Sequence, residues 1–190
     1  MCLSRVVESY ENEPLTDIKF GYKVFGGSFN TFYGLYISNG PMRVGKWYTD
    51  CNEKRLLTGQ GFQRYLSGYH IYSSLNAIGC SVKTCKVKFT DITVLGKNLG
   101  YLKYFEDGEE YKYYDCYVAR KMMIIDTVDN LAKKIESDAA YRAYDAGLGV
   151  SEWESFLTED ETKELVEYAD FGFGTWSKEP EQLKRVKEIL

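Results

Sequence analysis

Apolar and polar residues alternate over much of the first two thirds of the chain, and this period of two is typical of strands with one face in water. The clearest case is the segment of residues 81–96. Its expected buried face carries Cys85, Val87 and Phe89, and its expected wet face carries Thr84, Lys86 and Lys88. The segment therefore predicts a strand at the surface of a sheet.

Other alternating runs, bounded by glycine or polar turn residues, predict further strands. These expected strands span residues 21–27, 31–38, 42–49, 68–74 and 115–125. In the last of them, strict alternation puts Arg120 on the same face as Met122. Residues 74–79 predict one or two helical turns with Ser74 as the cap, and residues 107–112 predict a loop or a hairpin tip.

Beyond these strands the pattern changes to helix-forming segments. Residues 127–147 predict a helix that ends at Gly147, because glycine is common just after the last helical residue. Residues 157–172 predict a second helix. Its first turn has a capping box, with Thr158 as the N-cap and Glu161 three residues later.

Composition divides the chain at the same place. Residues 1–126 hold 16 basic and 13 acidic residues, a net charge of +3, and 14 of the 17 tyrosines. Residues 127–190 hold 8 basic and 15 acidic residues, a net charge of −7, and end in a third expected helix over residues 178–190. We therefore expect an α+β protein, with a compact, mainly antiparallel β-rich body over residues 1–126 and an acidic helical appendage over residues 127–190.

The five cysteines favour free thiols in a reducing compartment, because their number is odd and their spacing irregular. They form no C-x-x-C pair, and the chain has one histidine, so we expect no metal site. No cofactor is expected either, since the glycines match neither the dinucleotide nor the P-loop fingerprint. The first residues lack the apolar region of a signal peptide, and no apolar run is long enough to span a membrane. These features predict a cytoplasmic protein.

His70 is that one histidine, and it lies in the expected strand 68–74. Alternation puts Tyr69 on one face of this strand and His70 with Tyr72 on the other. One interpretation is a structural imidazole, hydrogen-bonded at the edge of a sheet. The other is an acid–base or ligand-binding group, because imidazoles titrate near neutral pH.

Cys2 is a second candidate for chemistry. Removal of Met1 would leave the Cys2 thiol beside a free α-amine, and the amine could then act as a base for a nucleophilic thiol. The alternative is a small buried apolar residue in the first strand or turn.

Basic and aromatic residues are interleaved on the expected strands, as they are in proteins that bind nucleotides or single-stranded nucleic acid. The candidate binding residues are Tyr69, His70, Tyr72, Lys46, Trp47, Arg120 and Lys121. The alternative is a wet sheet face covered by lysines, and a net charge of +3 is a weak attraction for nucleic acid. The acidic helices are likewise either a surface for a basic partner or simply solvated.

Six segments taken in order resemble a family of small uncharacterised proteins from bacteriophages and some bacteria. The segments are MCLS (1–4), GYKVF (21–25), VGKWY (44–48), GYHIYSS (68–74), VKTCKVKF (82–89) and VARKMMI (118–124). Members of this family look like an opening MCL followed by strands of the types Y-K-V-F, V-G-K-W, G-[FY]-H-[VI] and V-A-[RK]-K-[ML]. The resemblance covers residues 1–126. It implies that the following residues occupy family motif positions: Cys2, Lys46, Trp47, His70, Arg120 and Lys121.

The resemblance also implies a phage setting. The first hypothesis is thus an accessory protein that binds a host protein in the host cytoplasm, including antagonism of a host defence system in the manner of an anti-CRISPR protein. A second hypothesis is an enzyme that uses Cys2 or His70, as an N-terminal-nucleophile hydrolase or as an ADP-ribosyltransferase-like enzyme. A third is a binder of nucleotides or nucleic acid through the tyrosine- and lysine-rich sheet. A homo-oligomer is compatible with each of them.

Overall fold

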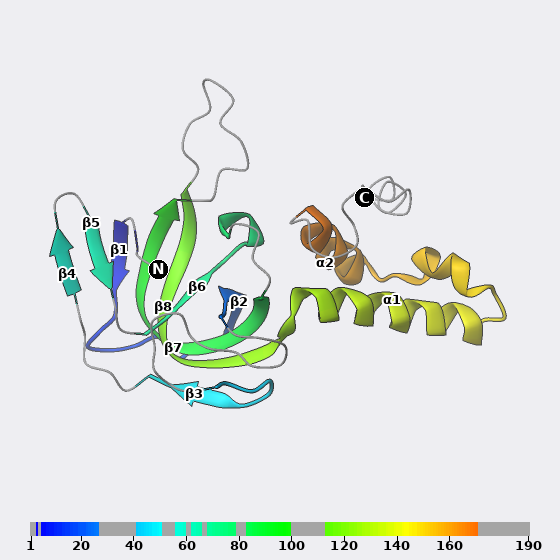
Figure 1. Cartoon of the computed structure of the whole chain (residues 1–190), viewed down its shortest axis with the longest axis horizontal. Helices are drawn as coiled ribbons and strands as arrows, with labels where there is room; N and C mark the ends of the chain where they lie inside the picture. Colours follow the sequence, from blue (N-terminus) through cyan, green and yellow to red (C-terminus); the bar gives the residue numbers. More distant parts are fainter. Residues whose placement is uncertain are drawn as a thin grey trace, which may run out of the picture. The chain divides into compact units, whose positions relative to one another are not determined.

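The computed structural model describes residues 3, 5–26, 41–50, 56–59, 62–65, 68–78, 83–99 and 113–170. These residues fall into two compact units that divide between Asp126 and Thr127. The first unit holds the strands, and the second holds the longer helices (Figure 1). The expected α+β class, a mainly antiparallel β-rich body followed by helices, is confirmed.

The described part of the first unit contains eight strands and one short 3-10 helix. They are β1 (Arg5–Ser9), β2 (Lys19–Val24), β3 (Trp47–Thr49), β4 (Leu56–Gly59), β5 (Phe62–Tyr65), β6 (Tyr69–Tyr72), η1 (Leu75–Ala77), β7 (Thr84–Leu99) and β8 (Tyr113–Thr127). The second unit contains α1 (Val128–Asp145), the 3-10 segment η2 (Val150–Phe156) and α2 (Glu159–Asp170).

Six of the strands form one sheet, in the order β1-β7-β2-β6-β8-β3, and β4 pairs with β5 alone. In addition, β7 pairs with β8. The pairings of β7 with β2, β2 with β6, β6 with β8 and β8 with β7 therefore close a circuit, which we call the strand ring. Figure 1 shows β7 and β8 as the long, strongly curved strands that make this closure. A closed circuit leaves fewer unpaired strand edges than an open sheet does.

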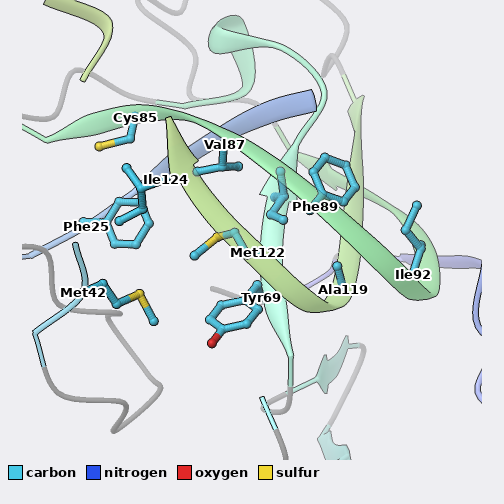
Figure 2. Packing of buried hydrophobic residues seen from close by; sticks show 11 residues of the cluster. Phe25, Met42, Tyr69, Cys85, Val87, Phe89, Ile92, Ala119, Met122 and Ile124 are labelled. Atoms are coloured by element: carbon cyan, nitrogen blue, oxygen red, sulfur yellow. The ribbon is translucent and has the colours of Figure 1, made fainter. Parts of the chain in front are cut away.

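The core of the first unit is built from side chains of the strand ring and of the segments next to it (Figure 2). Its members are Phe25, Met42, Tyr69, Ile71, Cys85, Val87, Phe89, Ile92, Ala119, Met122 and Ile124. Cys85, Val87 and Phe89 are fully buried, as their alternation predicts. Thr84 is also buried, contrary to the sequence prediction, so the wet face of β7 begins only at Lys86.

Both long strands change the face that they turn to the core partway along. In β7 the core positions run to Phe89 and resume at Ile92, an odd step that breaks the alternation. Asp91 lies within this step and has a backbone φ of 54°. In β8 the core residues are Ala119 and then Met122. The prediction that Arg120 shares a face with Met122 does not describe their environments, because Arg120 is exposed and Met122 is buried in the core.

Most of the strands predicted from alternation are present in the structure. The expected strands 21–27, 68–74, 81–96 and 115–125 correspond to β2, β6, β7 and β8. The expected strand 42–49 is confirmed only over β3, because the chain turns at Gly45, where φ is 76°. The expected strand 31–38, loop 107–112 and helix 178–190 lie outside the described residues. Sequence reasoning missed β1, β4, β5 and η2.

In the second unit, the structure confirms the predicted end of the first helix and the predicted start of the second. At the end of α1, Gly147 has a φ of 78°, its N–H donates to Tyr144 O, and the Leu148 N–H donates to Ala143 O. This pair of bonds is the Schellman ending of a helix. Before α2, the Thr158 N–H donates to Glu161 Oε2 at 2.8 Å, and the Glu161 N–H donates to Thr158 Oγ1 at 3.2 Å, which completes the capping box.

Candidate functional site

The three candidate residues of β6 are buried. Tyr69 is completely covered and belongs to the core (Figure 2), while His70 and Tyr72 are 6% and 5% exposed. His70 lies opposite Val118 and Tyr72 opposite Cys116 in the neighbouring β8, and these partners are buried too. A macromolecular partner therefore meets almost none of the surface of β6 in this structure.

Titratable groups beside β6 have pKa values set by burial. Lys23 Nζ donates to His70 O at 3.1 Å, and burial lowers the pKa of Lys23 to about 8, against a smaller opposing effect of Cys116. Burial raises the pKa of the Cys85 and Cys116 thiols to about 12. Since the thiolate is the reactive form of cysteine, neither of these thiols is suited to nucleophilic catalysis at neutral pH.

The other candidate residues lie together, at β3 and the part of β8 that pairs with it. Trp47 lies opposite Met123, and Thr49 lies opposite Lys121. Because directly paired residues project to the same face, Trp47 and Lys121 are diagonal neighbours on the outer face of this pair. Arg120 is exposed where β3 ends, and its carbonyl accepts the Asp50 N–H at 2.8 Å.

The turn that leads into β3 is fixed from the inside. Met42 is buried in the core, and the partly buried Tyr48 packs against the core. The Tyr48 hydroxyl accepts the Arg43 N–H at 2.7 Å, and Lys46 Nζ lies 5.5 Å from the centre of the Tyr48 ring. The Gly45 N–H donates to Ile124 O at 2.9 Å and so ties the tip of the turn to β8. These contacts favour the observed conformation of the turn.

This fixed turn presents two basic and two apolar side chains to solvent. We call them the β3 turn surface: Arg43, Val44, Lys46 and Trp47. Trp47 is 40% exposed, although indole rings are usually mostly buried. Sequence reasoning found Lys46 and Trp47 but not Val44. The turn residue Gly45 was the available signal, because it places its neighbours at an exposed tip.

Lys121 forms an ion pair with a residue of a neighbouring strand. Lys121 Nζ forms an ion pair with Asp91 Oδ2 at 2.9 Å, and Asp91 is the residue of β7 with a positive φ. The pair thus joins β7, at its residue with a positive φ, to β8. Lys121 is therefore engaged in holding the two curved strands together, in addition to any role at the surface.

The remaining sequence-predicted chemistry was compared with the described residues. Cys2 lies outside the described residues, so its predicted chemistry stays a prediction. Within the described residues, no three His, Cys, Asp or Glu side chains are grouped so as to bind a metal ion. An open pocket is lined by the single segment of residues 9–17 and contains none of the candidate residues. Among the described helices, none has the length and apolar character needed to cross a membrane.

Comparison of the chain with protein-family models, with curated proteins and with solved structures gave no match. The resemblance to small phage and bacterial proteins stays a prediction. At the β3 turn surface two of the candidate residues, Lys46 and Trp47, meet solvent together with Arg43 and Val44.

Proposed function

We propose that this protein is a phage-type accessory protein that binds a host protein in the host cytoplasm and thereby antagonises a host function such as defence. We further propose that the β3 turn surface is where the host protein docks. The observation that carries the proposal is the half-exposed Trp47 on a turn that is fixed by the Tyr48 hydrogen bond and by Met42.

The residue types of the surface favour this role. Tryptophan and arginine are over-represented among the residues that contribute most to protein–protein binding. A turn that is already rigid loses little conformational entropy on binding, which increases affinity. Arg43 and Lys46 flank the apolar side chains, so the complementary host surface is an apolar pocket with an acidic rim.

A protein partner fits the described surface better than single-stranded nucleic acid does. Proteins that bind single strands stack successive bases on several aromatic rings. The β3 turn surface offers one such ring, Trp47, because the Tyr48 ring faces inward against the core. The tyrosines of β6 are buried and provide no further stacking surface.

Affinity capture from a host lysate tests the proposal. The full chain is immobilised through a C-terminal tag, and retained proteins are identified by mass spectrometry. Trp47→Ala is expected to reduce capture of the specific host protein at least about tenfold, which is the effect of losing about 1.4 kcal/mol of binding free energy. Lys46→Glu is expected to reduce capture as well, because it reverses the charge that faces the acidic rim.

Phe20→Ala is the matched control, because Phe20 is a 57% exposed aromatic residue of β2, and β6 and β8 separate β2 from β3 in the sheet. It should capture the host protein as well as the wild type does. Equal capture by Trp47→Ala and wild type would contradict the proposed docking surface. Loss of all capture after nuclease treatment of the lysate would identify the partner as nucleic acid instead.

A further inference from the structure

The helical unit carries a second group of exposed apolar side chains. Tyr141 and Tyr144 lie three residues apart near the end of α1 and are 69% and 70% exposed. The chain continues past the Schellman ending into two further exposed apolar residues. We call the group the α1 tyrosine patch: Tyr141, Tyr144, Leu148 and Val150. Tyr141 and Tyr144 are neighbours on one face of α1, and exposed apolar side chains grouped in this way are typical of an interaction surface.

Acidic residues border this patch. Asp138 and Asp145 are exposed, and they lie three residues before and four residues after Tyr141 on the same face of α1. Glu152 is exposed two residues after Val150. The patch therefore has an apolar centre and a negative rim. A partner that matches it needs an exposed apolar centre with a positive rim.

The β3 turn surface of the same protein has this complementary character. Its apolar centre consists of Val44 and Trp47, and its rim carries the positive charges of Arg43 and Lys46. Both surfaces are fixed locally, one by the Tyr48 hydrogen bond to the turn and the other by the Schellman ending at Gly147. Association of two such surfaces costs little conformational entropy.

We infer that the α1 tyrosine patch of one copy docks on the β3 turn surface of a second copy. The contact joins two different surfaces, so it is heterologous and extends into a closed ring or an open row of copies. Because the same β3 turn surface is proposed to bind the host protein, self-association would compete with host binding. This regulatory consequence rests on the proposed function, whereas the self-association does not.

Sedimentation velocity of the full chain tests the inference. The protein concentration is varied over about a hundredfold range, because a small interface associates weakly and becomes populated only at high concentration. The wild type is expected to form species larger than the monomer as concentration rises, and less so in high salt, which screens the charged rims. Tyr141→Ala and Trp47→Ala should each weaken association about tenfold or more. Tyr113→Ala is the control, because Tyr113 is a 54% exposed tyrosine outside both surfaces.

Charge reversal tests whether the two proposed surfaces contact each other. Asp145→Lys and Lys46→Glu should each weaken self-association. An equimolar mixture of the two variants should associate again. The patch of the Asp145→Lys variant is then more positive, and it meets the more negative β3 turn surface of the Lys46→Glu variant. The native patch of the Lys46→Glu variant also meets the native β3 turn surface of the Asp145→Lys variant.

A wild type that stays monomeric over the whole concentration range would overturn the inference, as would a mixture that associates no better than the separate variants. The host-capture experiment fails or succeeds independently. Tyr141→Ala should still capture the host protein, because its β3 turn surface is intact. Self-association without host capture would reject only the proposed function.

Discussion

Lys23 shows how far a single residue can depart from the usual behaviour of its type. It is 4% exposed, it lies opposite the core residue Cys85, and its amine donates to the carbonyl of His70. The ring of Phe25 lies 5.9 Å from the same amine. A carbonyl and a ring face replace part of the lost hydration, but burial still lowers the pKa of Lys23 to about 8.

We predict that the free energy of unfolding rises with pH because of Lys23. Its pKa is lower in the folded chain than the ordinary 10.5, so between pH 8 and 10.5 the unfolded chain binds more protons. The stability penalty of a buried ammonium is full below pH 8 and is relieved above it. Relative to Lys23→Met, the wild type should gain about 2 kcal/mol between pH 7 and 9.5.

Urea unfolding of both proteins at the two pH values measures this gain. The raised pKa values of Cys85 and Cys116 destabilise the fold above pH 9. Removal of the Lys23 charge raises the pKa of Cys116 further, but both folded thiols stay protonated at pH 9.5 in either protein, so this effect nearly cancels in the comparison. The same pH response in wild type and Lys23→Met would show that Lys23 does not change its proton affinity on folding.

At the scale of elements, the approach of β2 to β6 decides whether the strand ring closes. These strands share one register pair, Tyr22 with Tyr72. A Cβ on Gly21 would lie 2.5 Å from the carbonyl oxygen of Tyr72 and 2.8 Å from the Ile71 side chain. Glycine is therefore needed at position 21 for a steric reason, since a carbonyl of the neighbouring strand occupies the space of a side chain.

Gly21→Ala should destabilise the first unit by more than about 2 kcal/mol, because relief of the overlap moves one strand backbone away from the other. Gly45→Ala is the control in the same unit. A Cβ there meets no atom within 4 Å, so only the cost of a φ of 76° remains, about 1 kcal/mol. Thermal unfolding followed by circular dichroism compares the two. Equal losses would refute the steric role of Gly21.

The start of α2 gives a second prediction at this scale. Glu161 Oε2 accepts from the Thr158 N–H and from Arg142 of α1 at 2.6 Å, so one carboxylate both caps α2 and joins it to α1. Thr158→Ala should reduce the protection of the Glu161 amide from hydrogen exchange by about 1 kcal/mol. Thr158→Ser keeps the accepting oxygen and should retain the protection. Loss of protection in both variants would contradict the capping role.

At the scale of the whole molecule, the strand ring controls how reagents reach the core. A reagent can reach the buried side chains only when several paired strands separate together. Cys85 and Cys116 lie on β7 and β8, two strands of the closed circuit, and both are buried. Because their pKa values are raised to about 12, the native thiols are also protonated. Labelling of these residues requires the ring to open rather than a loop to move.

We predict that a thiol reagent labels Cys85 and Cys116 at the same slow rate in the native protein, measured on separate peptides by mass spectrometry. Gly21→Ala should increase both rates by the same factor, because it destabilises the closed ring. Phe20→Ala should change neither. Rapid labelling of one thiol and slow labelling of the other would show that the ring opens in parts.

The sequence by itself determined what depends on a few neighbouring residues. The capping box at Thr158, the helix ending at Gly147 and the buried face of Cys85, Val87 and Phe89 all follow from local rules. So does the α+β class, because strand and helix periods differ along the chain. Lys46 and Trp47 were also identified as surface candidates from residue type and spacing.

Only the tertiary structure decided which face of each strand is covered and which residues meet. Burial of both faces of β6 depends on β2 and β8, whose residues are tens of positions away in the sequence. The exposure of Arg120, between the core residues Ala119 and Met122, likewise depends on which parts of β8 other segments cover, and alternation alone did not predict it. His70 was a candidate for chemistry because of its residue type. Its burial beside Val118 results from strand pairing, which the sequence does not encode locally.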